Sequence, residues 1–339
     1  MAGEIWLFIK EKLRAMMRWI GSLFVKLWLY IKGLVSSTTG DTWRKILVGL
    51  PLVFVVYILL GMPIANRIDD DLSPVIEKTA GGSFAVDTII HLVDREVEKN
   101  NWTANDPFFF PAFYLDNTPN YQRGMIAAIS RFSFELRDQI GRVRSSSAAD
   151  KDLDLAAGNL SKDPNEWVLG GGKFLPRTAS DSFYKEGLRQ LQSYNARVAN
   201  GDAVFERRSD NLLATLERIA SDLGASSAAQ DQYIEENAGG FLPDFGVDNE
   251  FYQIKGQVYA YAMILTALQD DFSKVLKDRE LESLYRQLLI SMRNAANLDP
   301  LVVTNGSPSG IVQNHLSIQG FYLLRARTQL KEITNVLLK

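Results

Sequence analysis

Residues Ile46–Ala65 read ILVGLPLVFVVYILLGMPIA and contain no charged side chain. At about 1.5 Å of rise per residue, a helix of this length extends roughly 30 Å, the thickness of the hydrocarbon core of a bilayer. A cleaved signal peptide would have a shorter apolar core and a much shorter basic segment before it. The stretch therefore predicts one transmembrane helix, within residues 41–66.

The charges on the two sides of this stretch predict its orientation. Residues 1–45 contain eight Lys and Arg residues and three acids, so their net charge is +5. The whole chain has a formal net charge of −3, so the residues after Lys45 carry −8. Because positive flanks stay on the cytoplasmic side, we expect a cytoplasmic N-terminus and a C-terminal part on the outer side, which is the periplasm if the source is Gram-negative. The acidic outer part also disfavours nucleic acid as a partner.

Residues 1–40 predict a basic amphipathic helix. Apolar residues recur at alternating intervals of three and four from Trp6 to Leu34, and most basic residues fall on the opposite side. The apolar arc is broader than a coiled-coil seam, which favours contact with the anionic inner leaflet over a coiled coil or a packed cytoplasmic helix. The residues expected at the membrane interface are Trp6, Lys10, Arg14, Arg18, Trp19, Lys26, Trp28, Lys32, Arg44 and Lys45.

Residues 67–339 predict a large α-helical domain. Helical stripes of apolar residues lie within 126–143, 184–198, 212–223, 254–272, 281–292 and 316–337. Alternation of the strand kind is nearly absent. The expected fold class is all-α: an interfacial helix, one transmembrane helix and a helical bundle. Breaks between helices are expected at residues 145–149, 170–172, 224–229, 239–240 and 305–310.

Two segments of this domain allow more than one interpretation. The aromatic segment Trp102–Tyr121 is non-helical in pattern, and it either folds over the bundle or forms an exposed contact surface. The run Asp69–Asp71 could bind a cation loosely, but a solvated charge run beside the membrane explains it more simply.

The sequence contains little that points to catalysis. It has no cysteine and two histidines, and it lacks the motifs of phosphate-binding loops, dinucleotide-binding folds, serine hydrolases and zinc proteases. His91 is expected to be a partly buried structural histidine. We therefore expect no catalytic site, no cofactor and no metal. Glu98, Glu135 and Asp138 are weak candidates for a hydrolase that uses carboxylates.

Four segments resemble a proteobacterial family, the domain of unknown function 2333 family. They are residues 116–124 (DNTPNYQRG), 134–142 (FELRDQIGR), 194–195 (YN) and 205–213 (FERRSDNLL), and the resemblance covers most of residues 45–339. It implies an inner-membrane protein with one N-terminal span, and it implies no activity. The polar positions of these segments predict a buried hydrogen-bonded network or a ligand site: Asp116, Asn117, Arg137, Asp138, Arg208, Asp210 and Asn211.

Three functional hypotheses follow. The first is a single-pass structural or interaction protein of the cell envelope, a scaffold or assembly factor that contacts membrane lipids and a protein partner or a second copy. The second is a sensory or ligand-binding periplasmic module, which needs a pocket between helices. The third and weakest is an envelope hydrolase.

Overall fold

The computed structural model describes residues 42–142, 149–169, 176–237, 246–300, 302–306 and 313–339, together with Leu29, and it describes the side chains of the first of these ranges from Gly49 onward. The chain divides into two units, Met1–Leu60 and Gly61–Lys339. The boundaries expected at residues 40 and 66 stay predictions.

Helix α2, Thr42–Ala65, contains the whole uncharged run, so the helix expected there is present. No helix in the part of the chain that the structure describes has both the length and the apolar character needed to cross a membrane. The predicted span is therefore not confirmed. Arg44 and Lys45 belong to α2. The remaining residues expected at the membrane interface lie outside the described residues: Trp6, Lys10, Arg14, Arg18, Trp19, Lys26, Trp28 and Lys32.

The second unit is helical. Its helices are α3 (Phe84–Asp94), α4 (Asn117–Glu135), α5 (Lys151–Leu160), α6 (Ser180–Asn200), α7 (Ser209–Asn237), α8 (Val247–Asp271), α9 (Ser273–Asp278), α10 (Glu282–Ala296) and α11 (His315–Leu337). Shorter turns follow or connect them: η1 (Arg95–Lys99), η2 (Pro111–Phe113) and η3 (Leu136–Ile140). Among the described residues there is no strand, and one isolated bridge joins Asn305 to Asn314. The all-α helical bundle is confirmed.

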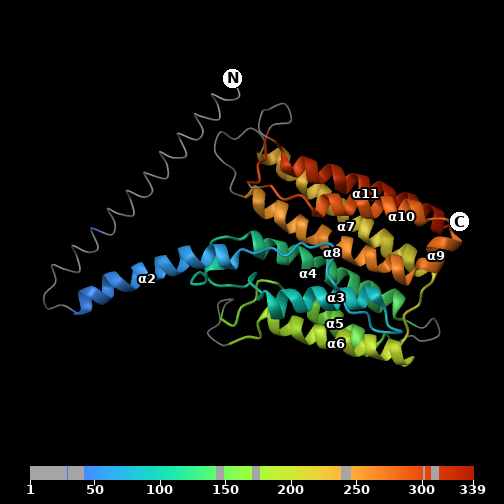
Figure 1. Cartoon of the computed structure of the whole chain (residues 1–339), viewed down its shortest axis with the longest axis horizontal. Helices are drawn as coiled ribbons and strands as arrows, with labels where there is room; N and C mark the ends of the chain where they lie inside the picture. Colours follow the sequence, from blue (N-terminus) through green and yellow to red (C-terminus); the bar gives the residue numbers. More distant parts are fainter. Residues whose placement is uncertain are drawn as a thin grey trace, which may run out of the picture. The chain divides into compact units, whose positions relative to one another are not determined.

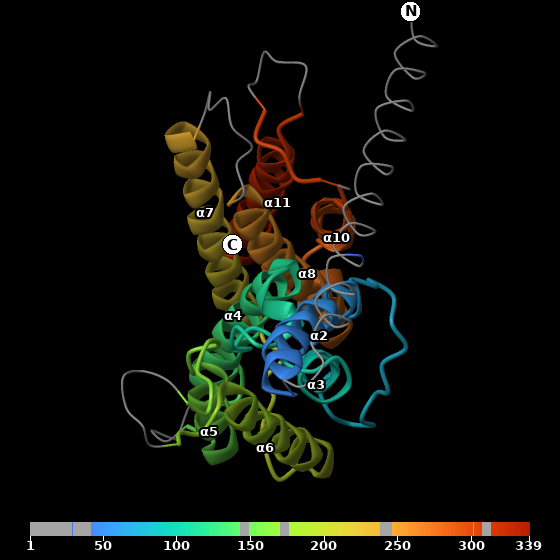
Figure 2. The ribbon, with the colours of Figure 1, turned by 90° about the vertical axis from the view of Figure 1, so that its left-hand side faces the viewer.

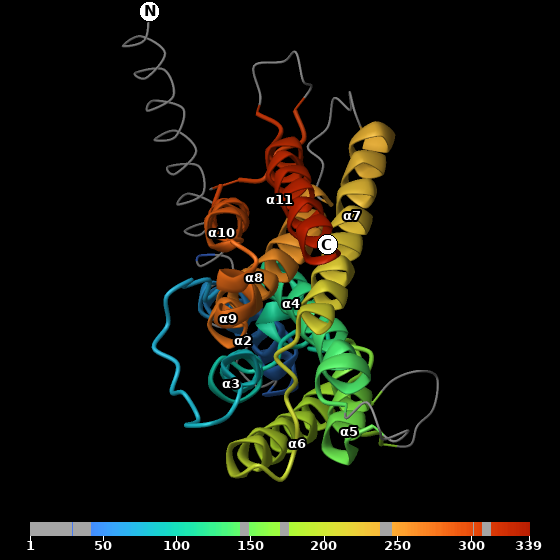
Figure 3. The same cartoon turned by 90° about the vertical axis from the view of Figure 1, so that its right-hand side faces the viewer.

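Helices α4 and α8 form the centre of the bundle. They pack against each other, α5 and α6 pair on one side, and α7 and α11 pair on the other (Figures 1, 2 and 3). Helix α3 contacts both α6 and α8, and α10 contacts α8 and α11. One hydrophobic core runs through all of these layers. Helix α8 is buried on nearly every side because it has neighbours all around it.

One expected break is wrong. Residues 224–229 lie inside α7, which continues without interruption to Asn237. A Cβ on Gly224 would lie 2.9 Å from Cζ of Arg327 in α11, so this glycine lies inside the helix beside the end of an arginine side chain. The breaks expected at 170–172 and 239–240, and most of those at 145–149 and 305–310, lie outside the described residues.

Candidate functional site

Helix α3 begins at a strongly capped N-terminus. The hydroxyl of Ser83 accepts a hydrogen bond from Val86 N at 3.2 Å, as an N-cap does. The carboxylate of Asp271, from the end of α8, accepts hydrogen bonds from Ser83 Oγ, Phe84 N and Ala85 N at 2.8, 3.2 and 2.9 Å. A carboxylate at this position also interacts favourably with the helix dipole. The start of α3 is thereby fixed to the end of α8.

One turn later, Asp87 connects α3 to the chain that precedes it. Its carboxylate accepts hydrogen bonds from the backbone N and the hydroxyl of Thr79, both at 2.8 Å, and from Asn195 Nδ2 at 2.6 Å. Asn195, on α6, also accepts a hydrogen bond from Ser83 N at 2.8 Å. A buried carboxylate needs such donors, and the three partners hold residues 76–79 close to α3 and α6.

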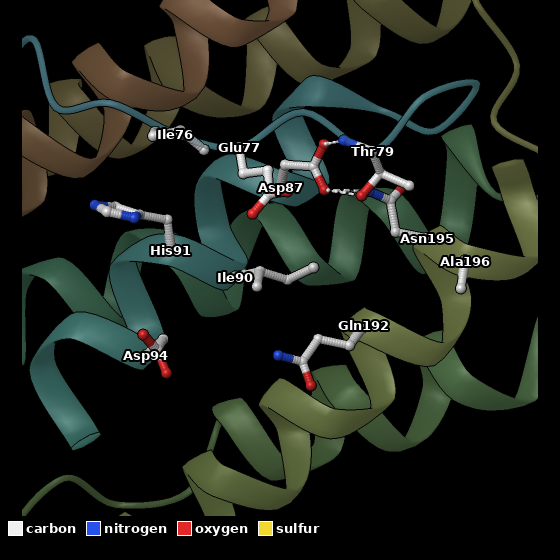
Figure 4. Close-up of a pocket in the computed structure, with 10 residues that line it drawn as sticks. All are labelled: Ile76, Glu77, Thr79, Asp87, Ile90, His91, Asp94, Gln192, Asn195 and Ala196. Carbon is white, nitrogen blue, oxygen red and sulfur yellow. Dashed lines mark hydrogen bonds between the residues drawn. The ribbon is translucent and has the colours of Figure 1, made fainter. Parts of the chain in front are cut away.

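A groove of about 380 Å³ lies beside this bridge (Figure 4). His91, Asp94 and Gln192 line one part of it, Ile90 lies between them and the Asp87–Thr79 bridge, and Asn195 and Ala196 lie across from His91. Burial lowers the pKa of His91, and the nearby Arg95 and Lys99 lower it further. His91 therefore has a neutral imidazole at neutral pH and presents one donor and one acceptor.

A second, smaller pocket of about 220 Å³ lies on the other side of Thr79 and Asp87. It contains charges of both signs. Lys78 pairs with Asp270 and lies 4.0 Å from the centroid of the Phe84 ring, and Arg207 lies 3.3 Å from Asp271. Among the described residues, no group of three or more His, Cys, Asp or Glu side chains could hold a metal ion. Much of the polar chemistry of both pockets is engaged in internal contacts, with His91, Asp94 and Gln192 among the polar groups that line the rest of the groove.

The second candidate region lies under the connecting segment, which we define as residues Asn66–Asp71 between α2 and the bundle. Arg95, 5% exposed, pairs with Glu96 at 2.8 Å and with Asp69 at 3.4 Å, and donates to the hydroxyl of Tyr259 at 2.7 Å. Burial alone would lower the pKa of Arg95, but the carboxylate of Glu96 and the weaker effect of Asp69 raise it above its usual range. Arg95 is therefore a permanent buried cation.

A second buried cation lies beside the first. Lys255 of α8 is 1% exposed and pairs with Asp70 at 2.6 Å and with Asp299 at 3.4 Å. The backbone of the connecting segment is bound as well. Tyr121 donates to the carbonyl of Asp69 at 3.0 Å, and Tyr259 donates to the carbonyl of Asp71 at 2.8 Å.

The expectation of a solvated charge run at Asp69–Asp71 holds only in part: Asp69 and Asp71 are exposed, but Asp69 and Asp70 also pair with buried cations. Asp69 and Asp70 offset the charges of two buried cations, and sequence reasoning missed those partners because they are far away in the chain. One signal was available. Lys255 follows Phe251 by four residues and precedes Val258 by three, which places a cation on the apolar stripe of α8.

The polar positions taken from the resemblance form local contacts in separate elements. Arg137 pairs with Asp138 at 2.7 Å in η3, Arg208 pairs with Asp210 at 3.0 Å, and Asn211 donates to the carbonyl of Glu206 at 3.0 Å. Asp116 and Asn117 lie at the start of α4. Arg137, Asp138, Arg208 and Asp210 are partly exposed, so the buried polar cluster of this bundle is built mainly from other residues.

The weak hydrolase candidates also lie in different elements. Glu98 pairs with Lys185 at 3.5 Å, and Glu135 lies 3.9 Å from Arg218. Burial raises the pKa of Glu135, and Arg218 opposes this shift. Asp138 is engaged by Arg137.

The fold and these contacts define the class: an all-α bundle that follows a helix with a long uncharged run and a segment bound to buried cations. The chain matches the family described as "uncharacterized protein conserved in bacteria", the domain of unknown function 2333 family, over residues 65–238 and 230–339. The chain belongs to this family. No curated protein and no solved structure matches it.

Proposed function

We propose that this chain is a single-pass, membrane-anchored structural or interaction protein of the bacterial cell envelope, with a cytoplasmic N-terminus and a periplasmic bundle. The uncharged run Ile46–Ala65 supports the span, as does the charge difference between its flanks. Eight large apolar side chains of α2 are exposed, and at 3.6 residues per turn they cover more than half of the helix circumference. They are Leu50, Val53, Val55, Val56, Tyr57, Leu59, Leu60 and Ile64. An apolar helix of this kind favours apolar surroundings.

The observation that carries the proposal is the junction between the last turn of α2 and the bundle. A Cβ on Gly61 would lie 2.4 Å from Cγ of Pro111, so the backbone of Gly61 lies against that residue. The side chain of Asn66 accepts hydrogen bonds from the backbone N and the hydroxyl of Thr118 at 3.2 and 3.0 Å. With the contacts of Asp69–Asp71, this arrangement supports an anchor whose last turn and following segment are bound to the bundle.

The proposal includes no catalytic step and no cofactor. The basic N-terminal helix would lie on anionic lipid of the inner leaflet, and the bundle would bind an envelope protein or a second copy. Apolar burial and about 1 kcal/mol for each basic residue near anionic lipid would hold the N-terminal helix there.

The test begins with extraction and topology. Washing isolated envelopes at alkaline pH should leave the full chain in the membrane, whereas the variant Val53→Lys/Val56→Lys should be released and the matched variant Val53→Leu/Val56→Leu should be retained. A reporter active only in the cytoplasm should be inactive when fused after Lys339. Release of the unaltered chain, or an active reporter, would contradict the proposal.

The interaction role needs its own measurement. Crosslinking in intact cells, followed by purification in detergent, should recover either a stoichiometric partner or a crosslinked homo-oligomer. Recovery of the monomer alone would argue against a scaffold.

The groove beside His91 favours a second candidate function, a ligand-binding module. Ala196 borders the groove and is exposed, so Ala196→Phe should fill it, and Ala127→Phe on the exposed face of α4 is the matched control. A small polar molecule that raises the unfolding temperature of the parent and of Ala127→Phe, but not of Ala196→Phe, would support this candidate. Equal shifts in all three proteins would remove it.

A further inference from the structure

An exposed aromatic surface lies beside the junction of α2 and the bundle. It comprises Phe108–Phe110, Phe113, Tyr114 and the adjoining Trp167–Leu169, and we call it the aromatic rim. Phe108 is 62% exposed, Phe113 52% and Leu169 53%. The Phe109 ring contacts the rings of Phe108, Phe110 and Trp167, with centroids 5.0–5.5 Å apart. Four of these rings thus form one cluster, and Phe113 and Tyr114 form a second pair of rings close to it in the chain. Exposed apolar side chains gathered in this way are of the kind that marks an interaction site.

The residues just before the rim are buried and hydrogen-bonded to neighbouring segments of the bundle. Trp102 and Asn105 are buried, and they donate to the carbonyls of Pro164 and Glu166, both at 3.0 Å. Thr103 donates from both its backbone N and its hydroxyl to Gln122 at 2.9 Å. The first part of the segment Trp102–Tyr121 thus folds into the bundle, and its middle is exposed. The expectation of a non-helical segment is wrong for its last five residues, because α4 begins at Asn117.

The place of the rim limits what can cover it. In the sequence, Pro111 lies between Phe108–Phe110 and Phe113. It is also the residue against which the backbone of Gly61 lies. Gly61 is four residues before the end of the uncharged run, so the rim is level with a point about 6 Å inside that end. In a spanning helix this is the depth where hydrocarbon gives way to headgroups, and aromatic side chains concentrate there.

The low charge of the aromatic rim also favours lipid as the partner that covers it. Between residues 106 and 114 the sequence DPFFFPAFY has a single charged residue, Asp106, and no cation. A surface of this composition does not depend on anionic headgroups for attraction, and its rings can enter the boundary between headgroups and acyl chains directly.

We propose that the aromatic rim is a membrane-contact surface, which enters the lipid boundary on the side of the membrane where the bundle lies. This inference rests on the proposed membrane anchoring. It assigns the bundle a second contact with the bilayer besides α2. Two contacts fix the tilt of the bundle as well as its distance from the membrane.

The test uses the full chain, which has no native cysteine, in vesicles of phosphatidylethanolamine and phosphatidylglycerol. Single spin labels are attached through Phe108→Cys, Phe113→Cys, Leu60→Cys and Leu338→Cys, one label for each protein. Leu338 is exposed and belongs to the C-terminal end of the bundle, which lies away from the last turn of α2 (Figure 1). Collision rates with oxygen and with a water-soluble nickel chelate report the depth of each label.

The label at Leu60 should be reached by oxygen and shielded from nickel, and the label at Leu338 should show the reverse. Labels at residues 108 and 113 should resemble Leu60, with somewhat more access to nickel because they lie nearer the boundary. If Leu60 reports lipid and residues 108 and 113 report water, the rim proposal fails and the anchor stands. If neither reagent reaches residues 108 and 113, protein covers the rim, and the proposal also fails. If Leu60 itself reports water, the proposed function fails.

Discussion

Gly124 and Gly256 allow the backbones of α4 and α8 to touch. A Cβ on Gly124 would lie 1.7 Å from the carbonyl oxygen of Gln253, and one on Gly256 would lie 2.0 Å from that of Tyr121. Backbone atoms cannot rotate away as a side-chain end can. The two central helices would therefore have to separate, and the core packed around them would separate with them.

Gly256→Ala should lower the free energy of unfolding by about 3 kcal/mol, because overpacking typically costs about 1–3 kcal/mol and here the obstacle is backbone. Gly158→Ala in α5, with nothing within 4 Å, is the matched control. It should raise stability by about 0.5–1 kcal/mol through helix propensity. Denaturant unfolding followed by circular dichroism in detergent measures both. Equal effects of the two substitutions would refute the backbone contact.

The buried Lys255 gives a second prediction at this scale. Asp70→Asn leaves the cation with Asp299, whose side chain is 79% exposed, and should cost about 3 kcal/mol of unfolding free energy. Asp299→Asn should cost less than about 1 kcal/mol, since exposed pairs contribute little. In the Asp70→Asn background, Lys255→Met should recover most of the loss, because it removes the unpaired charge. If the double variant is no more stable than Asp70→Asn, the ion pair is not the reason for the loss.

Asp106 predicts a pH dependence. Burial raises its pKa to about 6, above the value near 4 of an unfolded chain. The folded chain therefore binds this proton more tightly, and the resulting stability is present below about pH 4 and is lost as the pH rises through about 6. Asp106→Asn should be more stable than the parent by about 1 kcal/mol at pH 7.5, a figure reduced for the partial exposure of the carboxyl. The difference should vanish near pH 4. The exposed Asp202→Asn controls for the loss of one charge, and a pH-independent difference for Asp106→Asn would contradict the assignment.

At the scale of elements, apolar periodicity was enough to locate α4, α6, α7, α8, α10 and α11. It missed α3, because Ala85–Ile89 is buried on all sides and shows no stripe. It also missed the short α5. The break wrongly expected at residues 224–229 has a related cause. In the sequence, a glycine inside a helix cannot be distinguished from a glycine that ends one.

The candidate site could be predicted only in part, for a physical reason. Sequence shows which residues are charged, but the meeting of Asp70 with Lys255 depends on the folded path of the chain. The sequence left two alternatives for the aromatic segment, and the exposure of Phe108–Phe110 could not be read from it, because exposure depends on the folded path of the chain. His91 was correctly placed as partly buried, while the groove beside it requires three separate elements.

The side chain of Asn66 caps the first turn of helix α4. Asp116, at the N-cap position, makes no side-chain capping bond, and the carbonyl oxygen of the Asn66 side chain accepts from Thr118 instead. Asn66→Ala should therefore speed hydrogen exchange of the first turn of α4 and lower stability by about 1 kcal/mol. Asn66→Asp, which retains the acceptor, should preserve protection, and the exposed Arg67→Ala should have little effect. Unchanged exchange in Asn66→Ala would show that the first turn does not depend on this bond.

At the scale of the whole molecule, the chain that follows α2 is bound along much of the length of the bundle. Asn66 contacts Thr118 at the start of α4, Asp71 contacts Tyr259 in the middle of α8, and Lys78 pairs with Asp270 near its end. The bundle needs these contacts for its own stability. If α2 is the proposed anchor, we expect its covalent continuity into Asn66 to add something else, a coupling of the direction of the helix to the bundle.

Inserting six Gly and Ser residues between Ala65 and Asn66 separates these two roles. The contacts of the connecting segment with the bundle are retained, and only the hydrogen bond from Asn66 N to the carbonyl of Met62 is lost, so the unfolding midpoint of the bundle should stay within about one degree of the parent. The direction of α2 is no longer transmitted, because such a linker is a flexible coil. A spin label at Phe108 should then gain access to the nickel chelate, while the same insertion at the exposed turn Gly201–Asp202 should leave that label unchanged. If the label at Phe108 keeps its depth with the linker at residue 65, the rim binds lipid without help from α2. If the midpoint falls sharply, α2 is part of the fold of the bundle and not only its anchor.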